Sequence, residues 1–466
     1  MRFHYTLCIE INHMKRKGAI QMLLDKTISV DQLIQLAADA QKEYRQFDQG
    51  AVDRVVEAMA TAATDQAEHL ATLAHEETGF GNIKDKTTKN LFASQTIYEY
   101  LKDKTSVGIY ERDEANKIYK VARPIGVIAA LIPMTNPTST VISKVLNALK
   151  ARNSIILSPH PRAEKGTIET AKILNEAAVK AGAPDGLIQV LVSPTLEKTQ
   201  ELLHHEGIGL NLATGGTPMV KAAYASGNPT IGVGGGNTPI IIDEGADLAF
   251  AAKTIVDSKT FDYGVICSSD QHIITLKSME DEVKEALKDA KVYFLTPEEA
   301  QKIDELIFLK PGVKNIDVVG QPAHKIAKMA GIDTPEDTTL LLGYAPEDVS
   351  IESCFTREVL GPVLGFHLVD DFDGAVNKAN DLLDQEGKGH TSVLFSNNQD
   401  HIEKYGIEVN CSRNLVNTQG VLGSIGAITN LPPSLTLGVG TEGGGSLTHN
   451  VAYEVYFNTV YVAFGE

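Results

Sequence analysis

The chain of 466 residues has few cysteines and no long hydrophobic run. Its four cysteines, Cys8, Cys267, Cys354 and Cys411, are far apart, form no C-x-x-C pair and follow no secretory signal. We therefore expect a protein of a reduced compartment, which places it in the cytoplasm. No apolar stretch reaches the roughly 20 residues that a membrane-spanning helix needs, so we expect no membrane association.

Positive charge is also scarce, since 42 Lys and Arg residues stand against 60 Asp and Glu, for a net charge of −18. Nucleic-acid binding needs clustered basic side chains, so we expect no nucleic-acid partner. The 13 histidines include no H-E-x-x-H pattern, and the adjacent His204 and His205 would point in different directions on a helix. We therefore expect no metal site.

Apolar strands alternate with helices over most of the chain. After two helical segments at 29–47 and 52–78, we expect strands at 125–133, 154–158, 187–192 and 208–214, each followed by a helix. The alternation resumes after the glycines 234–236, with strands at 239–242 and 271–276. Continuous apolar strands between helices are typical of parallel sheets covered on both faces. We predict an α/β fold with two doubly wound domains, at 22–235 and 236–430.

Two further segments have the composition of strands outside these domains. Residues 107–122 are extended around a turn at 113–116, and the C-terminal VAYEVYFNTVYVAF is rich in Val, Tyr and Phe. We expect 431–466 to be a return segment with a final strand that joins 107–122 in a small β arm, linking subunits into a homodimer or homotetramer. Residues 1–21, with a basic cluster at 15–17, are an N-terminal extension that need not be ordered.

The candidate chemistry begins at Cys267, in TFDYGVICSSD. The apolar residues stop at this sulfur and small polar residues begin, which favours a thiol at the edge of a cavity over one packed in a core. Asn136, in TNPTS, follows a strand, and Pro137 keeps it out of the next helix. A thiolate that attacks an aldehyde carbon needs such an amide to stabilise the new oxyanion. Taken alone, Asn136 is more typical of a turn than of an oxyanion site.

Two glycine-rich motifs compete for a nucleotide. Gly438, Gly440 and Gly443 spell G-x-G-x-x-G, but no helix-forming segment follows, so we interpret this motif as a flexible glycine loop. The segment ATGGTPMV, 213–220, follows a strand and opens a helix, whose free N–H groups could face a phosphate or a nicotinamide. A plain strand–helix turn explains this segment equally well.

The chain resembles the CoA-acylating aldehyde dehydrogenases of the aldehyde dehydrogenase superfamily. IPMTNPTST, SPHPRA, TGGTPMVKAA, GGGNTP, FDYGVICSS, GHTSVLFS and LPPSLTLG stand in family order between residues 33 and 450. The resemblance implies that the first domain binds NAD and that Cys267, in the second, is the nucleophile, with Asn136 as oxyanion donor. It also implies a cofactor site formed by Ser158, His160, Pro161, Thr214, Gly215, Gly216, Val233, Gly234 and Glu358, the last of which contacts the nicotinamide ribose.

Differences from other members of the superfamily make the expected activity more specific. Hydrolytic relatives carry a glutamate in E-L-G-G-K that activates water, and here Val233 takes its place in V-G-G-G-N. Without that base the thioester should wait for a CoA thiol, because a general base contributes about 10²–10⁴-fold. His160 replaces a lysine on the adenosine ribose, so NADP is a second candidate cofactor. His390, in GHTSV, could shuttle a proton from CoA, although a histidine satisfied by its neighbours is the more common case.

We therefore expect an NAD-dependent enzyme that converts a short-chain aldehyde and CoA to acyl-CoA, with acetaldehyde as the leading substrate. Sulfoacetaldehyde is the competitor, and its sulfonate would be bound by Arg357, Arg413 or the loop 440–446. A hydrolytic aldehyde dehydrogenase and a non-catalytic assembly protein with the same fold are the remaining alternatives.

Overall fold

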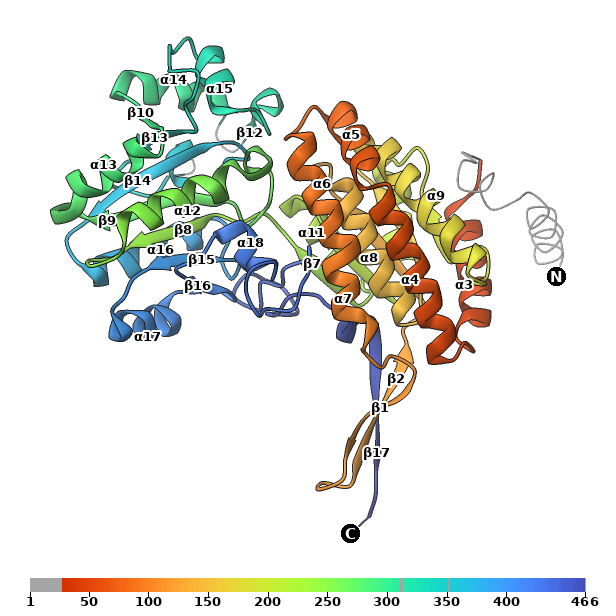
Figure 1. The fold of residues 1–466 in the computed structure, drawn as a ribbon. Coiled ribbons are helices and arrows are strands. Elements are labelled where there is room, and N and C mark those ends of the chain that lie inside the picture. Colours follow the sequence, from red (N-terminus) through yellow and green to blue (C-terminus); the bar gives the residue numbers. More distant parts are fainter. Residues whose placement is uncertain (1–26, 311–312, 351, 466) are drawn as a thin grey trace.

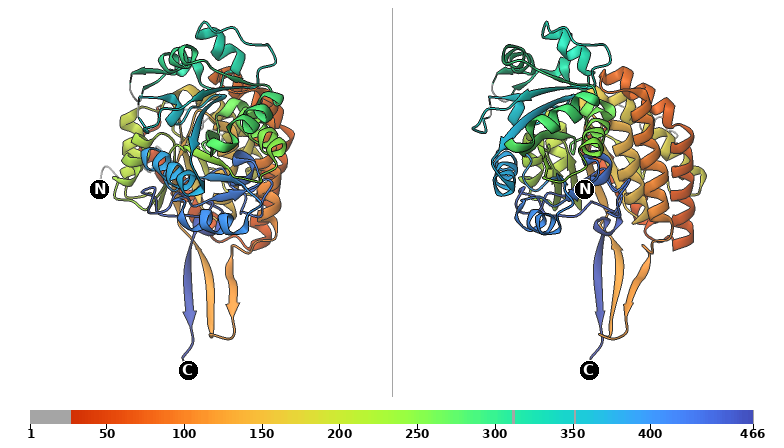
Figure 2. Two further views of the ribbon diagram at one scale, coloured as in Figure 1. Left: turned by 90° about the vertical axis from the view of Figure 1, so that its left-hand side faces the viewer. Right: turned by 60° about the vertical axis from the view of Figure 1, so that its left-hand side comes forward.

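The computed structural model describes residues 27–310, 313–350 and 352–465. Two α/β units lie side by side, and a narrow arm that includes the C-terminal strand projects away from them (Figures 1 and 2). Each unit has a parallel sheet with helices on both faces, and the arm is a small antiparallel sheet. The α/β fold with two doubly wound units and a β arm is therefore confirmed.

The first unit has a five-stranded sheet of order β5-β4-β3-β6-β7. Alternate residues of β3 face opposite helix layers, as the period of a strand requires: Ile128 and Ala130 pack with α4, α8 and α9, whereas Val127 and Ala129 pack with α3 and α10. Its elements are β3 (Val127–Ile132), β4 (Ser154–Pro159), β5 (Ile188–Val190), β6 (Leu210–Thr214), β7 (Thr230–Val233), α3 (Val30–Tyr44), α4 (Gln49–Asp65), α5 (Ala67–Thr78), α6 (Ile83–Leu91), α7 (Ile97–Lys102), α8 (Pro137–Lys150), α9 (Glu164–Lys180), α10 (Leu196–His204) and α11 (Thr217–Tyr224).

The second unit has a seven-stranded sheet of order β10-β13-β14-β9-β8-β15-β16. Ile240 and Ile242 of β8 pack under α12 and α13, and Ile241 packs under α16 and α17. Its elements are β8 (Thr238–Ile242), β9 (Asp270–Leu276), β10 (Val292–Phe294), β13 (Leu340–Tyr344), β14 (Val363–Val369), β15 (Ser392–Phe395), β16 (Asn414–Val416), the hairpin β11 (Phe308–Lys310) and β12 (Val313–Lys314), α12 (Leu248–Thr260), α13 (Glu280–Asp289), α14 (Pro297–Ile307), α15 (Ala323–Met329), α16 (Phe372–Gln385), α17 (Gln399–Glu408) and α18 (Gly420–Ser424).

The arm joins segments that are more than 300 residues apart in the sequence. Strand β2 (Ile118–Pro124) pairs antiparallel with β1 (Gly108–Asp113) on one side and with β17 (Phe457–Ala463) on the other. Near the tip of β17, Tyr461 and Val462 are exposed on strands that carry no helical cover. The predicted pairing of 107–122 with the C-terminal strand is therefore present.

Local details differ from the sequence prediction at two places, the helix at 52–78 and the loop at 438–448. The helix predicted over 52–78 is two helices, α4 and α5, because Gln66 leaves the helical region (φ −105°, ψ 10°). Helix α8 begins at Pro137, whose fixed φ suits a first helical position. The loop at 438–448, predicted to be flexible, is anchored by Arg413, which donates to the carbonyl oxygens of Gly438 and Thr448. The extension at 1–21 lies outside the described residues.

Candidate active site

The predicted site residues collect where the two sheets meet. Asn136 follows β3 and Thr214 ends β6, and these strands are neighbours although the chain visits β4 and β5 between them. A parallel sheet binds ligands at such a switch point, beyond the carboxyl ends of its strands. Cys267, Glu358 and His390 instead precede β9, β14 and β15, so they lie at the amino ends of the second sheet.

Asn136 is the N-terminal residue that flanks α8, yet its side chain does not cap the helix. Its Nδ2 group donates to the carbonyl oxygen of Val265 at 3.4 Å and to Oγ1 of Thr135 at 3.1 Å. Val265 lies two residues before Cys267, so the amide of one unit faces the cysteine loop of the other. The two predicted catalytic residues are therefore brought together.

Cys267 is partly exposed, whereas both serines that follow it are buried. Burial of the sulfur and, to a smaller extent, the nearby carboxylate of Glu358 together raise the pKa of its thiol to about 12, and the guanidinium of Arg413 opposes both effects. The resting residue is thus a thiol, and reaction requires a proton acceptor or a transition state that stabilises negative charge.

The glycines 234–236 let the backbone run against the cysteine loop. A methyl group on Gly236 would lie 2.1 Å from the carbonyl oxygen of Cys267 and 3.3 Å from Nδ1 of His390, so no larger residue fits. The N–H of Gly236 donates to Oε1 of Glu358 at 3.1 Å, and Lys314 Nζ lies 2.6 Å from the other oxygen of this carboxylate. Both oxygens of Glu358 therefore have partners, and Val233, at the end of β7, is a buried apolar side chain.

His390 is buried beside this loop. Its Nδ1 lies 2.9 Å from Oγ1 of Thr391, and its Nε2 has no partner in the part of the chain that the structure describes. Burial and the charge of Arg413 lower its pKa to about 3, so the ring is neutral at physiological pH. Because the protonated ring is this acidic, it keeps a proton only briefly. The predicted shuttle role of His390 is therefore less favourable, although a brief transfer through the ring is still compatible with it.

The segment from Thr214 to Gly216 forms an open cradle at the start of α11. Among the described residues, Oγ1 of Thr214 is buried without a hydrogen-bond partner, and a methyl group built on Gly215 would contact nothing within 4 Å. No side chain caps α11, so N–H groups of its first turn are available to a ligand. An anionic dinucleotide fits these features, because helix N-termini attract phosphates.

The other helix start near the predicted cofactor site, that of α9, is already occupied. The carboxylate of Glu77 accepts the N–H groups of Lys165 and Gly166, each at 2.8 Å. A phosphate would therefore bind at α11 rather than at α9. The sequence alone does not distinguish the starts of α9 and α11 as phosphate sites, whereas the structure does.

The remaining predicted cofactor residues differ in orientation. Ser158 is buried, with its hydroxyl 3.2 Å from Oγ1 of Thr199, so its side chain faces the interior. His160 and Pro161 are exposed just beyond β4. Nδ1 of His160 accepts the N–H of Arg162 at 3.1 Å, which places the ring proton on Nε2 and leaves it a donor.

The two arginines predicted to bind a sulfonate are engaged elsewhere. Arg413 is buried and donates to the carbonyl oxygens of His390, Gly438 and Thr448. Arg357 makes two hydrogen bonds to Glu386, at 3.1 and 3.2 Å. Both guanidinium groups are therefore already hydrogen-bonded within the protein, one to backbone carbonyl oxygens and the other to a carboxylate.

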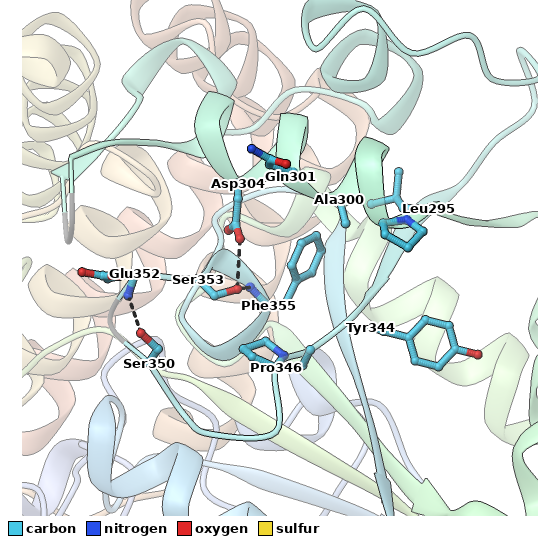
Figure 3. Close-up of a pocket in the computed structure, with 12 residues that line it drawn as sticks. Leu295, Ala300, Gln301, Asp304, Tyr344, Pro346, Ser350, Glu352, Ser353 and Phe355 are labelled. Carbon is cyan, nitrogen blue, oxygen red and sulfur yellow. Dashed lines mark hydrogen bonds between the residues drawn. The ribbon is translucent and has the colours of Figure 1, made fainter.

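A cavity of about 540 Å³ opens in the second unit, beyond the ends of β10 and β13 (Figure 3). Leu295, Tyr344 and Phe355 contribute apolar surface, and Asp304 bonds to the backbone of Cys354. None of the predicted site residues lines it, so we assign it no part in the chemistry. Within the described ranges no cluster of three metal-ligating side chains occurs, and no helix is long and apolar enough to cross a membrane.

Sequence reasoning missed a buried cluster behind Asn136. Lys86 and Lys89 of α6 both contact Oδ2 of Asp262, and Lys89 also donates to Oδ1 of Asn136. The sequence carried a signal, because a lysine pair spaced three apart on a helix shares one face. Lys144 of α8, which is buried against the carbonyl oxygens of Leu131 and Leu212, was also missed.

Comparison with known proteins gives a consistent result. Residues 9–300 match the family described as "Aldehyde dehydrogenase family". The bifunctional aldehyde-alcohol dehydrogenase AdhE of Escherichia coli is 42% identical over 95% of this chain and 50% of its own length. An acetylating succinate-semialdehyde dehydrogenase of Clostridium kluyveri is 34% identical over 95% of this chain and 97% of its own.

A solved structure is also similar. The acetylating aldehyde dehydrogenase of Geobacillus thermoglucosidasius superimposes with a TM-score of 0.91 at 45% identity, covering 96% of this chain and 97% of that one. Against the bifunctional relative, by contrast, the chain spans about half of the length. The chain belongs to the aldehyde dehydrogenase family.

Proposed function

We propose that the protein is an NAD-dependent, CoA-acylating aldehyde dehydrogenase. It converts a short-chain aldehyde, CoA and NAD⁺ to acyl-CoA, NADH and a proton, through a thioester on Cys267. The observation that carries the proposal is the amide of Asn136 held against the Cys267 loop, in a site where Val233 replaces a water-activating acid. Two relatives with acetylating activity in their names support the acyl acceptor.

The proposed reaction has two stages, the formation of a thioester on Cys267 and the transfer of its acyl group to CoA. The sulfur of Cys267 forms a bond to the aldehyde carbon, the carbonyl π pair moves onto oxygen to form an oxyanion, and the thiol proton passes to water. The Nδ2–H of Asn136 stabilises that oxyanion as it forms. NAD, when bound, supplies the acceptor for the hydride that leaves the tetrahedral carbon. The sulfur of CoA then attacks the resulting thioester, and Cys267 departs with acyl-CoA as the product.

Several features of the site favour CoA over water as the acyl acceptor. Glu358, a carboxylate close enough to influence Cys267, is held by Lys314 and Gly236, so it is poorly placed to deprotonate water. His390 is a neutral ring with a pKa near 3 and is a weak base. Without a base, hydrolysis of the thioester is slow, and a thiol nucleophile takes its place.

Acetaldehyde is the proposed substrate rather than sulfoacetaldehyde. A sulfonate needs a cationic or amide-lined pocket, and Arg357 and Arg413 are engaged with Glu386 and with backbone carbonyl groups. In the loop 440–446, the N–H groups of residue 440 and of residues 443–446 already donate within the protein, that of Ser446 to the hydroxyl of Tyr224.

The cofactor and assembly proposals follow from the same units. NAD binds to the first unit, within 22–235, through the cradle at Thr214–Gly216 and the exposed His160, while 236–430 supplies the nucleophile. Because His160 offers a neutral donor rather than a lysine, NADP is the alternative cofactor. The arm and its strand within 431–466 join a homodimer or homotetramer in the cytoplasm.

The test is an aldehyde panel with and without CoA, monitored by NADH absorbance. We expect sustained NADH formation only with CoA, fastest with acetaldehyde, and none in Cys267→Ala. Sustained NADH without CoA would establish the hydrolytic alternative. A wild-type chain that releases no NADH with any aldehyde, and that forms no acyl adduct, would support the assembly protein instead.

A further inference from the structure

Asp262 lies at the centre of a buried contact between the two α/β units. It belongs to the loop that leads to Cys267, and its backbone and that of Tyr263 adopt left-handed conformations (φ 48° and 51°). Its side chain has no solvent exposure. Oδ1 accepts the N–H of Asn82 at 2.8 Å, and Oδ2 contacts the ammonium groups of Lys86 and Lys89.

Helix α6 is shaped around this carboxylate. The N–H of Asp262 donates to Oδ2 of Asp85 at 2.8 Å, so the loop and the helix bind each other in both directions. A methyl group on Gly81, just before α6, would lie 1.8 Å from Oδ1 of Asp262. Only glycine permits this approach, and Gly81 also has a positive φ of 64°.

The two lysines of the cluster have different second partners. Lys86 donates to the backbone carbonyl of Thr135 at 3.2 Å. Lys89 donates to the side-chain oxygen of Asn136. Lys89 thus connects the side chain of the oxyanion donor in one unit to the nucleophile loop of the other, whereas Lys86 connects that loop only to the backbone beside Asn136.

The contact with Lys89 determines which way the Asn136 amide points. An ammonium group can only donate hydrogen bonds, so it donates to the Oδ1 end of the amide and repels the NH₂ end. With Oδ1 held, Nδ2 faces Val265 and the Cys267 loop, where the oxyanion forms. Without the ammonium, the amide could rotate by half a turn and present an acceptor to the oxyanion.

The charge state of the cluster supports this role. Burial lowers the pKa of Lys89 to about 8, although the carboxylate of Asp262 opposes that effect. Lys89 is therefore largely protonated at neutral pH, and its charge polarises the amide so that Nδ2–H becomes a stronger donor.

Resting on the proposed function, we propose that Lys89 is a positioning residue: it fixes Asn136 with its NH₂ group toward the Cys267 loop, and Asp262 ties it to that loop. The test compares Lys89→Met, the matched control Lys86→Met, Asn136→Ala and the double variant Lys89→Met/Asn136→Ala. The readout is the rate of the first NADH turnover with acetaldehyde and NAD, together with the dissociation constant of NAD.

We expect Lys89→Met to slow the first turnover by about 10- to 100-fold, less than the 10²–10³ typical of losing the donor itself. The dissociation constant of NAD should stay within about twofold, and Lys86→Met should slow turnover by no more than about threefold. In the Asn136→Ala background, Lys89→Met should cause no further loss, because the amide that it orients is absent.

Equal losses from Lys89→Met in both backgrounds, or no loss in the wild-type background, would overturn the proposal. If Lys89→Met does not fold, Lys89→Gln replaces it; a glutamine can present either end to Asn136, so the same loss and the same dependence on Asn136 are expected. A wild-type enzyme without NADH formation would refute the proposed function itself, whereas an impaired Asn136→Ala beside an unimpaired Lys89→Met would refute only this inference.

Discussion

The carboxylate of Glu358 lies 2.6 Å from the ammonium of Lys314 (Oε2 to Nζ) and packs closely against the glycines 235 and 236. The same carboxylate is one of the groups that raise the pKa of the Cys267 thiol. Glu358 therefore accepts a hydrogen bond from the backbone N–H of Gly236 and also influences the reactivity of the nucleophile.

Removing the charge of Glu358 should make Cys267 easier to ionise. A neighbouring negative charge disfavours the thiolate, so Glu358→Gln lowers the thiol pKa, and alkylation by iodoacetamide begins at lower pH, by roughly one unit. The measurement is the pH dependence of alkylation of the Cys267 peptide by mass spectrometry. The exposed Glu352→Gln makes the same change in net charge and should leave the profile unmoved; a shift toward higher pH in Glu358→Gln would contradict the electrostatic assignment.

Gly215 offers a test of the cofactor cradle that leaves the fold intact. A methyl group at this position meets no atom within 4 Å, so Gly215→Val should fold with an unchanged melting temperature. The added side chain fills the space assigned to NAD and should weaken NAD binding by about tenfold or more, a cost of at least about 1.4 kcal/mol. Titration of NAD fluorescence quenching measures it.

Gly406, in α17, is the matched control for Gly215. Its surroundings are equally open, and Gly406→Ala should stabilise the helix by about 0.5–1 kcal/mol without affecting NAD. Unchanged NAD affinity in Gly215→Val would move the cofactor away from the start of α11.

Val233 tests why the thioester waits for CoA. A carboxylate at this position would restore the acid that hydrolytic relatives carry, and Val233→Glu should therefore increase sustained NADH formation in the absence of CoA by about tenfold. The amide variant Val233→Gln has nearly the same shape but no basic oxygen of comparable strength. If both variants gave the same rate without CoA, the missing acid would not be the reason for the acyl acceptor.

The sequence predicted that Asn136 and Thr214 lie at the carboxyl ends of buried apolar strands, because such strands are recognisable from composition alone. That these two strands are neighbours is seen only in the structure. The Lys89–Asp262 contact joins residues 173 positions apart, and no local pattern specifies which face of α6 meets which loop. The hydrogen-bond partners of Arg413 were equally impossible to predict from the sequence, because they are backbone carbonyl groups that only the fold brings close to it.

The helix at 52–78 shows the complementary limit. Its apolar positions keep one helical period through Val52, Val56 and Met59, and the chain then bends at Gln66, a residue with ordinary helix propensity. After the break, α5 packs against α6, the helix whose Lys89 contacts Asp262. Periodicity predicts which residues are buried, whereas the bend depends on partners far along the chain.

The thioester on Cys267 is tested most directly by peptide mapping of the enzyme after incubation with acetaldehyde and NAD in the absence of CoA. We expect one acetyl group, carried by Cys267 as a thioester, which is lost when CoA is added and reappears as acetyl-CoA. An acyl group on Cys354 or Cys411, or NADH release with no acyl group on Cys267, would contradict it.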